Sequence, residues 1–219
     1  MDIKLLFLII FILAGLIIIF YNYLYQGVVG KYELINKNIL NMTQEYEKTI
    51  VIQEIIKRND LSMPGYGEGF VIQWDMYLPN VMGEQNWNTS YSIDKPLLRI
   101  GNTPQIYYNP KYNTLKVKVK YSENSFYAHE PIIELKNIPL QKWNNYIVVI
   151  NNNKVKIYLN GKQVINKSLN NVIILDYNDI IIGQTDNNIQ GQLKNATIYF
   201  RPMTHNEVKK QLLTKFKFF

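Results

Sequence analysis

The chain has 219 residues, 47% of them hydrophobic, and a net charge of +7 at pH 7. It is long enough for one domain of about 150 residues plus appendages, with enough apolar content for a packed core. The absence of cysteine excludes disulfides, thiolate metal sites and cysteine nucleophiles, and the presence of only two histidines nearly excludes a multi-histidine metal site. The basic excess suits an anionic partner without selecting one.

Residues 5–25 follow a short tail of residues 1–4, carry no charge and are dominated by Leu, Ile and Phe. At about 1.5 Å per residue, a helix of this length spans the roughly 30 Å hydrocarbon core of a lipid bilayer. A cleaved signal peptide would have a shorter apolar region and a small-residue cleavage site. We therefore expect an uncleaved anchor and a single-pass membrane protein. The few flanking lysines leave open the side of the membrane on which the domain lies.

Residues 26–48 form a stalk whose apolar residues are spaced like a helical stripe, namely Leu34, Ile35, Ile39, Leu40 and Met42. This spacing favours a short helix that docks on the domain or on a partner. A solvated spacer is the alternative.

From residue 49 onward the pattern indicates strands. Alternate residues are apolar in 70–76, and Val155, Ile157 and Leu159 alternate with polar residues before an Asn160-Gly161 hairpin turn. Further strands are predicted at residues 97–100, 105–108, 115–121, 131–135, 146–150, 163–165, 179–182 and 191–200. About ten short strands with regular turn signals predict an all-β sandwich. By the same periodicity, Trp74 and Trp143 are expected in the core.

The last segment, residues 202–219, changes to a helical pattern. Thr204 and Glu207 form a capping box that opens a predicted short helix at residues 206–213, and a basic tail follows.

The segments PLQKW, KIYLNGK, IIIG and GQLKNATIYFRPMTHNEV resemble the C-terminal half of a laminin G-like, concanavalin A-like jelly roll. The segments FVIQWDMYLP and EPIIELKNIPLQKW are most similar to versions in nucleocytoplasmic large DNA viruses. The resemblance covers residues 49–208 and implies an antiparallel jelly-roll sandwich over residues 49–201. The sequence departs from the family in the FVIQWDMYL strand, where the family usually has a Ser-Phe-Trp core. Trp74 supplies the bulk at this place.

Catalytic chemistry is not indicated. The glucanase branch of this superfamily places carboxylates on one strand as Glu-x-Asp-x-Glu, because alternate residues share a face. No Glu-x-Asp occurs in this chain. We therefore expect no enzyme activity, no catalytic residue and no cofactor. The remaining acids are interpreted as solvated loop or turn residues: Asp75, Glu134, Asp176, Asp179 and Asp186.

Laminin G-like domains often bind calcium at one rim, so the resemblance makes Asp176, Asp179 and Asp186 weak metal candidates. Oxygen ligands of this type suit Ca²⁺, but several must converge. Ordinary turn capping is the favoured interpretation.

Three lysines, Lys116, Lys118 and Lys120, lie at alternate positions and would line one face of a strand. They could bind phosphate or acidic sugar; the favoured alternative is a solvated face or a protected edge strand. Nucleic acid is not an expected partner, because the one nearby aromatic residue lies on the opposite face.

Trp87 and Tyr91 lie in a polar loop and could stack on a sugar ring or contact a protein partner; packing back on the sandwich is equally expected. Four sequons would be glycosylated only in the secretory lumen, at Asn41, Asn88, Asn166 and Asn195.

Two functions follow as hypotheses. The first is a membrane-anchored structural protein that contacts capsid or membrane proteins, as a minor component linking the internal membrane of a large DNA virus particle to its capsid. The second is a carbohydrate-binding or adhesion module displayed at a membrane surface, for which family analogy is the main support.

Overall fold

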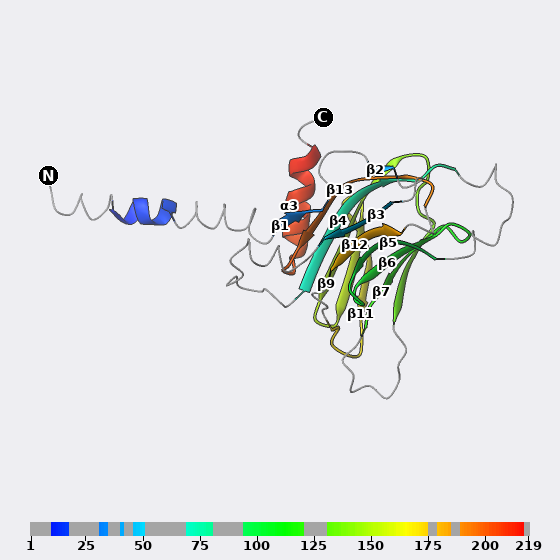
Figure 1. Cartoon of the computed structure of the whole chain (residues 1–219). Helices are drawn as coiled ribbons and strands as arrows, with labels where there is room; N and C mark the ends of the chain where they lie inside the picture. The colour runs from blue at the N-terminus through cyan, green and yellow to red at the C-terminus, as the bar shows by residue number, and fades with distance from the viewer. Residues whose placement is uncertain are drawn as a thin grey trace, which may run out of the picture.

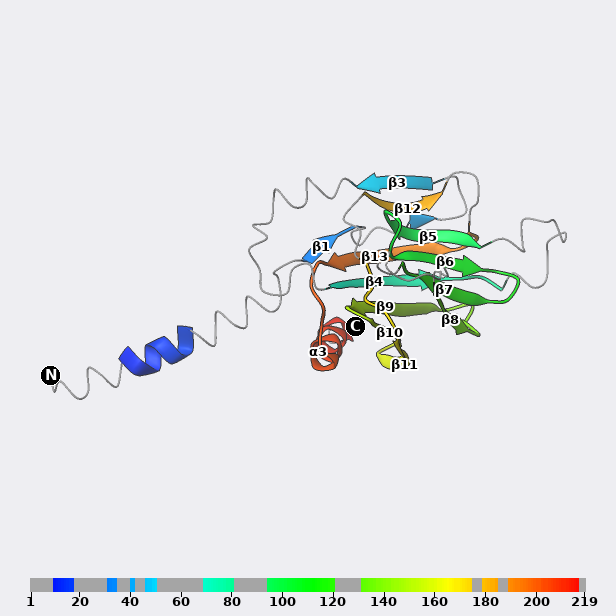
Figure 2. The same cartoon turned by 90° about the horizontal axis from the view of Figure 1, so that it is seen from below.

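A computed structural model describes residues 10–17, 31–34, 40–41, 46–50, 69–80, 94–120, 131–174, 179–184 and 189–216. These residues form two antiparallel sheets that pack face to face, followed by one helix near the C-terminus (Figures 1 and 2). The predicted all-β sandwich with a short C-terminal helix is confirmed.

The larger sheet, sheet A, has 7 strands, in the order β1-β13-β4-β9-β10-β11 with β2 also paired to β13. Its strands are β1 (Lys31–Glu33), β2 (Leu40–Asn41), β4 (Gly69–Tyr77), β9 (Trp143–Asn151), β10 (Lys154–Leu159), β11 (Lys162–Ser168) and β13 (Gln192–Tyr199).

The smaller sheet, sheet B, has 6 strands in the order β3-β12-β5-β6-β7-β8. Its strands are β3 (Tyr46–Ile50), β5 (Lys95–Ile100), β6 (Gln105–Asn109), β7 (Thr114–Lys118), β8 (Ile132–Lys136) and β12 (Ile180–Gln184). Every strand pair in both sheets is antiparallel.

The core lies between the sheets and is built by alternation. Phe70, Ile72, Trp74 and Met76 of β4 face inward and are 0–2% exposed. Opposite Trp74 on β9 lies Tyr146, and their rings stack with centroids 5.4 Å apart. Burying each such side chain contributes about 1.5–3 kcal/mol, before the conformational entropy that folding costs.

The β10–β11 hairpin turns at Asn160 and Gly161, whose φ angles are 49° and 82°. Both values lie in the left-handed region that Asn-Gly adopts with little strain, so the predicted hairpin is confirmed. A second glycine is required by space: a Cβ on Gly69 would overlap the backbone carbonyl of Ile150.

The predicted stalk helix is wrong for the described residues of that segment. Residues 31–33, 40–41 and 46–50 are strands that pair with β13 and β12, so the sandwich begins before residue 49. Leu34, which we assigned to a helical stripe, is 1% exposed in the core. The helical spacing of the apolar residues was not decisive, because an extended segment can also bury a residue such as Leu34. Its backbone then pairs with the edge of a sheet and does not form a helix.

Only part of the predicted anchor lies within the described residues, where residues 10–17 are helical (Figure 1). In the described part of the chain, no helix has both the length and the apolar character needed to cross a bilayer.

The C-terminal helix is α3 (His205–Phe216), and its predicted capping box is confirmed. The Thr204 amide donates to Glu207 Oε2 at 2.7 Å, and the Glu207 amide donates to Thr204 Oγ1 at 3.3 Å. The helix packs on the outer face of sheet A, where an apolar cluster joins it to the strands (Figure 2). This cluster consists of Val71, Ile147, Val149, Tyr158, Tyr199, Met203 and Val208.

A candidate ligand site on the outer face of sheet A

The helix α3 covers one part of the outer face of sheet A, and polar and aromatic side chains occupy another. Because Trp74 and Met76 face the core, Asp75 and Tyr77 of β4 must face outward. Register places Asn145 beside Asp75 and Trp143 beside Tyr77. We call this set the amide–aromatic patch, consisting of Gln73, Asp75, Tyr77, Trp143, Asn145, Lys194 and Asn195.

The contribution of β13 to the patch depends on an irregularity in its pairing. The register with β4 shifts between Lys194 and Thr197, and Asn195 adopts a φ of 53°. Such a bulge re-aims a side chain within a strand. Here it directs the Asn195 amide to Asp75 while Leu193 and Ala196 remain in the core.

The carboxylate of Asp75 is held by one amide on each side. Asn145 Nδ2 donates to Oδ1 at 2.6 Å, and Asn195 Nδ2 donates to Oδ2 at 2.6 Å. Hydrogen bonds to an ionised acceptor are short and about twice as strong as neutral ones. These two neutral donors therefore help to fix the position of the carboxylate.

Two polar atoms of the patch are buried and have no hydrogen-bond partner within the described part of the chain: Asn145 Oδ1 and Gln73 Nε2. Their residues are 8% and 2% exposed. A buried polar group without a partner costs about 1–3 kcal/mol, so native proteins rarely retain one without a reason. A ligand with hydroxyl groups could donate a hydrogen bond to Asn145 Oδ1 and accept one from Gln73 Nε2.

The aromatic part of the patch is half-buried. The rings of Tyr77 and Trp143 lie 5.9 Å apart, and the Lys194 ammonium lies 4.0 Å from the centroid of the Trp143 ring. The prediction that Trp143 belongs to the core is therefore wrong, because it sits at an outward position of β9. Trp74, by contrast, is buried as predicted.

The patch contains a carboxylate and amides but does not present the pair of carboxyl groups used by glycosidases. Such enzymes place two carboxyl groups about 5–9.5 Å apart around the scissile bond. On β4 the outward positions carry Gln73, Asp75 and Tyr77, and two of the groups bonded to Asp75 are the amides of Asn145 and Asn195. The arrangement can orient a polar ligand beside an aromatic surface.

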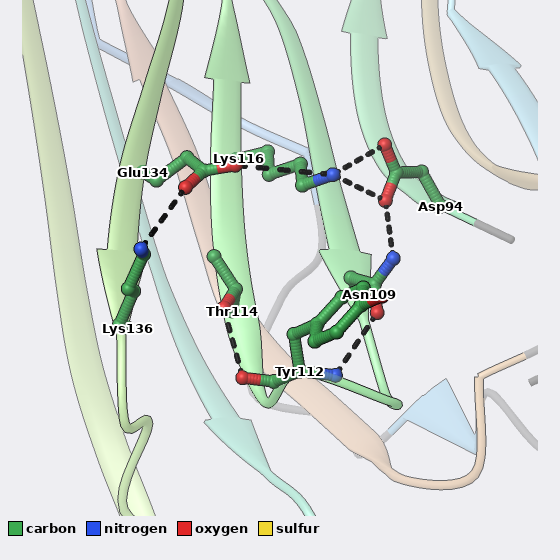
Figure 3. Close-up of polar contacts among 7 residues, drawn as sticks. All are labelled: Asp94, Asn109, Tyr112, Thr114, Lys116, Glu134 and Lys136. Atoms are coloured by element: carbon green, nitrogen blue, oxygen red, sulfur yellow. Dashed lines mark hydrogen bonds and ion pairs between the residues drawn. The ribbon is translucent and has the colours of Figure 1, made fainter. Parts of the chain in front are cut away.

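The sequence-predicted lysines occupy a different face, the outer face of sheet B. Lys116 Nζ lies 2.9 Å from Asp94 and 4.0 Å from Glu134, and its side chain is 17% exposed (Figure 3). Asn109 also donates to Asp94, at 2.7 Å, and Glu134 approaches Lys136 at 3.8 Å. The Lys116 charge is therefore balanced by neighbouring strands, which makes it a poor anion ligand.

Lys118 follows on the same face of β7, whereas Lys120 lies just past its end, where its amide donates to Thr103 Oγ1 at 3.0 Å. The edge-strand explanation for the three lysines is wrong, because β7 lies between β6 and β8. The edge strands of this sheet are β3 and β8.

Several other candidates fall outside the described residues, namely Trp87, Tyr91, Asn88, Asp176 and Asp186. Asp179 is described: it is exposed just before β12, and its backbone carbonyl accepts from the Gly101 amide at 3.1 Å. Within the described ranges, no group of three or more His, Cys, Asp or Glu residues could hold a metal ion.

The sequons that the structure describes differ in accessibility. Asn166 is exposed on the edge strand β11, whereas the half-buried Asn195 amide is bonded to Asp75. Asn41 lies in β2, opposite Gln192.

Sequence reasoning missed the patch and interpreted Asp75 as a solvated loop or turn acid. One signal was available: Asp75 interrupts the apolar strand at residues 70–76 and occupies an outward position beside Trp74. Its partners are 70 and 120 residues away in the chain, so their identity required the register.

A model of the laminin G type, described as the concanavalin A-like lectin/glucanases superfamily, matches residues 81–209. This match covers more than half of the chain. The protein belongs to this superfamily. No curated protein matches the chain.

Solved structures share this fold at low identity. The receptor binding domain of the botulinum neurotoxin C/D mosaic serotype has a TM-score of 0.61 and 9% identity, over 83% of this chain and 44% of that chain. The binding domain of Paraclostridial Mosquitocidal Protein 1 has a TM-score of 0.57 and 17% identity, over 85% and 46%. A botulinum neurotoxin type C structure has a TM-score of 0.55 and 16% identity, over 85% and 46%.

The superfamily member described here thus spans less than half the length of these toxin domains. At such identities the likeness establishes the fold.

Proposed function

We propose that this protein is a non-enzymatic binding module that recognises a glycan through the amide–aromatic patch. The carrying observation is a pair of buried amide atoms beside a fixed carboxylate, Asn145 Oδ1 and Gln73 Nε2, which have no hydrogen-bond partner among the described residues. Sugar hydroxyls both donate and accept hydrogen bonds, so one sugar ring can satisfy both amides and also bond Asp75. Membership of a lectin/glucanase superfamily supports the same class of ligand.

The aromatic residues supply the second requirement of sugar binding. The C–H face of a sugar ring is apolar and packs against aromatic side chains, while its hydroxyls face polar groups. Tyr77 and Trp143 lie one row from Asp75 and Asn145, so apolar and polar contacts are adjacent. Lys194 above Trp143 gives the site a cation at its border.

The glycan ligand is also compatible with the solved relatives. Entry of botulinum neurotoxin type C into cells depends on interaction with two ganglioside molecules. We propose a glycan ligand for the present chain as well, and the fold and the chemistry of the patch support it.

The test is glycan-array screening followed by calorimetric titration of the best ligand. The full chain is purified in a polyoxyethylene detergent, because sugar-headed detergents would compete for the site. Trp143→Ala should weaken binding at least tenfold, about 1.4 kcal/mol, through loss of the aromatic surface. Asp75→Asn should weaken it comparably while conserving side-chain shape.

Two variants serve as controls. Tyr112→Ala removes an aromatic ring that is 63% exposed on the β6–β7 turn and should leave affinity unchanged. Trp87→Ala tests the loop predicted from sequence. Affinity that depends on Trp87 and is indifferent to Trp143 would place the ligand elsewhere, and an array without any ligand would contradict the proposal.

A second candidate function is a membrane-anchored structural protein, favoured by the uncharged apolar run at residues 5–25. In this proposal the run holds the sandwich at a bilayer, where the domain contacts capsid or membrane proteins of a large DNA virus particle. Protease protection of membranes from expressing cells, combined with deglycosylation, gives the side of the membrane. Full extraction of the chain by carbonate would contradict the anchor.

A further inference from the structure

We propose that Asn160 is a positioning residue of the amide–aromatic patch, because its side chain holds the start of β9, the segment that carries Trp143 and Asn145. This inference rests on the proposed function, since it concerns the same ligand site. Asn160 lies outside the patch, in the turn between β10 and β11, where the sequence indicates only a hairpin. β9, β10 and β11 lie side by side at one end of sheet A (Figure 2), and the turn lies beside the start of β9.

Asn160 extends the pairing of β10 with β9 by one residue. Leu159 is paired with Tyr146, and beyond them the Asn160 backbone N–H donates to the Asn145 carbonyl at 2.8 Å. The return bond uses a side chain: the backbone N–H of Asn145 donates to Asn160 Oδ1, also at 2.8 Å. Asn160 has a left-handed φ of 49°, and its side-chain oxygen takes the place of the backbone oxygen that a strand residue would offer.

The nitrogen of the same carboxamide holds a second residue of β9. Asn160 Nδ2 donates to Asn144 Oδ1 at 2.9 Å. Asn144 Nδ2 in turn donates to the carbonyls of Pro139 and Lys142, at 2.8 and 3.1 Å. Asn144 is 1% exposed, so its carboxamide is a buried link between the turn and the segment that leads into β9. Trp143 lies within that segment, between two residues that this link holds.

These contacts act where β9 has a strand neighbour on one side only. β4 pairs with residues 143–151 of β9, whereas β10 pairs with residues 146–151. At Asn145, whose Nδ2 donates to Asp75 Oδ1 at 2.6 Å, the contacts on the β10 side come from Asn160. The Asn160 side chain therefore helps to set the position of Asn145 and Trp143, while the rest of β9 is held by two strands.

The variant Asn160→Gly isolates this role. Glycine adopts a left-handed φ readily, so a Gly-Gly turn keeps the hairpin and its register. The substitution removes both side-chain hydrogen bonds, from the backbone N–H of Asn145 and to Asn144 Oδ1, at residues that are 8% and 1% exposed. Affinity for the array-selected glycan should fall about fivefold, because the start of β9 loses its fixed position.

The matched control is Asn152→Gly, which makes the same change in the turn between β9 and β10. Asn152 is also exposed and also has a φ of 49°, but it lies at the opposite end of β9 from the patch. This variant should change glycan affinity less than about twofold. Equal losses in the two variants would show that any loosened turn weakens binding and would overturn the inference.

A second readout needs no ligand. In ¹⁵N-resolved NMR of the free full chain, in polyoxyethylene detergent, Asn160→Gly should shift the Trp143 indole and the Asn145 side-chain amide. The Trp74 indole should stay in place, and Asn152→Gly should leave all three signals unchanged. If the wild-type chain binds no glycan, the proposed function fails, and these shifts alone decide whether Asn160 positions the patch. Unchanged Trp143 and Asn145 signals in Asn160→Gly, or unchanged affinity for a glycan that the wild-type chain binds, would overturn the inference.

Discussion

The two outer faces of the sandwich use an aspartate in opposite ways. On sheet B, Asp94 faces a cation, with Lys116 Nζ at 2.9 Å, and receives an amide from Asn109. On sheet A, Asp75 is held by two amides at 2.6 Å, and the nearby Lys194 ammonium lies over a tryptophan ring. The first carboxylate pairs with a lysine, whereas the second accepts hydrogen bonds from two side-chain amides.

This difference separates a structural cluster from a candidate ligand site. Around Asp94, donors and acceptors are matched by neighbouring strands, and Figure 3 shows the resulting chain of contacts. Around Asp75, the supporting amides include one buried oxygen that has no partner among the residues the structure describes, and Gln73 adds a buried nitrogen of the same kind. A ligand would complete the second arrangement but would disrupt the first.

The comparison of the two aspartates predicts its largest effect on the free energy of unfolding when Asp75 is replaced. Asp75→Ala removes the acceptor of two short amide hydrogen bonds and leaves the nitrogen of Asn145, which is 8% exposed, with only the Trp74 carbonyl at 3.5 Å, so we expect a loss of about 2–3 kcal/mol. Asp94→Ala should cost about 1 kcal/mol, because Asp94 is partly exposed and Lys116 also approaches Glu134. Urea unfolding of both variants measures the difference; equal losses would contradict a stronger structural role for Asp75 than for Asp94.

A smaller effect is expected where α3 begins on the same face. Burial by itself raises the pKa of Glu207, but hydrogen bonds from the Thr204 backbone and from Arg201 outweigh it and lower the pKa below its ordinary value. A carboxyl group with a lowered folded-state pKa stabilises the protein above its unfolded pKa, and this stability is lost as pH falls through the folded value.

Glu207→Gln should therefore cost about 0.5–1 kcal/mol at neutral pH, as expected for a helix cap, and less in acid. Thermal unfolding at a series of pH values measures this dependence, with Lys209→Gln, exposed on the same helix, as the control. A cost that stays constant down to the acid range would show that the carboxylate charge plays no part.

Much of the fold could be predicted because its signals are local. The alternation at residues 70–76 gave the buried face of β4, Asn160-Gly161 gave the turn, and Thr204 with Glu207 gave the start of α3. Each depends on backbone preferences within a few residues, which single-sequence patterns record.

The wrong predictions for Trp143 and for the segment with Leu34 have a common cause. In both places tertiary contacts, and not the local spacing of apolar residues, decide the structure. Trp143 was assigned to the core because β9 is apolar on both faces. Its outer face is apolar because α3 covers Ile147 and Val149, so β9 lacks the alternation of apolar and polar residues that would mark Trp143 as outward-facing. The stripe containing Leu34 pointed to a helix, but the segment pairs with β13 instead.

The candidate site was beyond sequence reasoning for a related reason. Asp75 meets Asn145 and Asn195 only because β4 lies between β9 and β13, and the bulge in β13 was needed to aim Asn195. Strand order and bulges are properties of the assembled sheet, and neither is encoded in the residues near Asp75 alone.

The most direct test of the central claim is a titration of the array-selected glycan followed by ¹⁵N-resolved NMR of the tryptophan indole and side-chain amide groups. The chain has 3 tryptophans, so each indole signal can be assigned by a single substitution. We predict that the Trp143 indole and the amides of Asn145, Asn195 and Gln73 shift on binding, while the buried Trp74 indole stays in place. Shifts confined to Trp87, or a bound ligand that leaves the Trp143 indole and these amides unmoved, would contradict the amide–aromatic patch as the binding site.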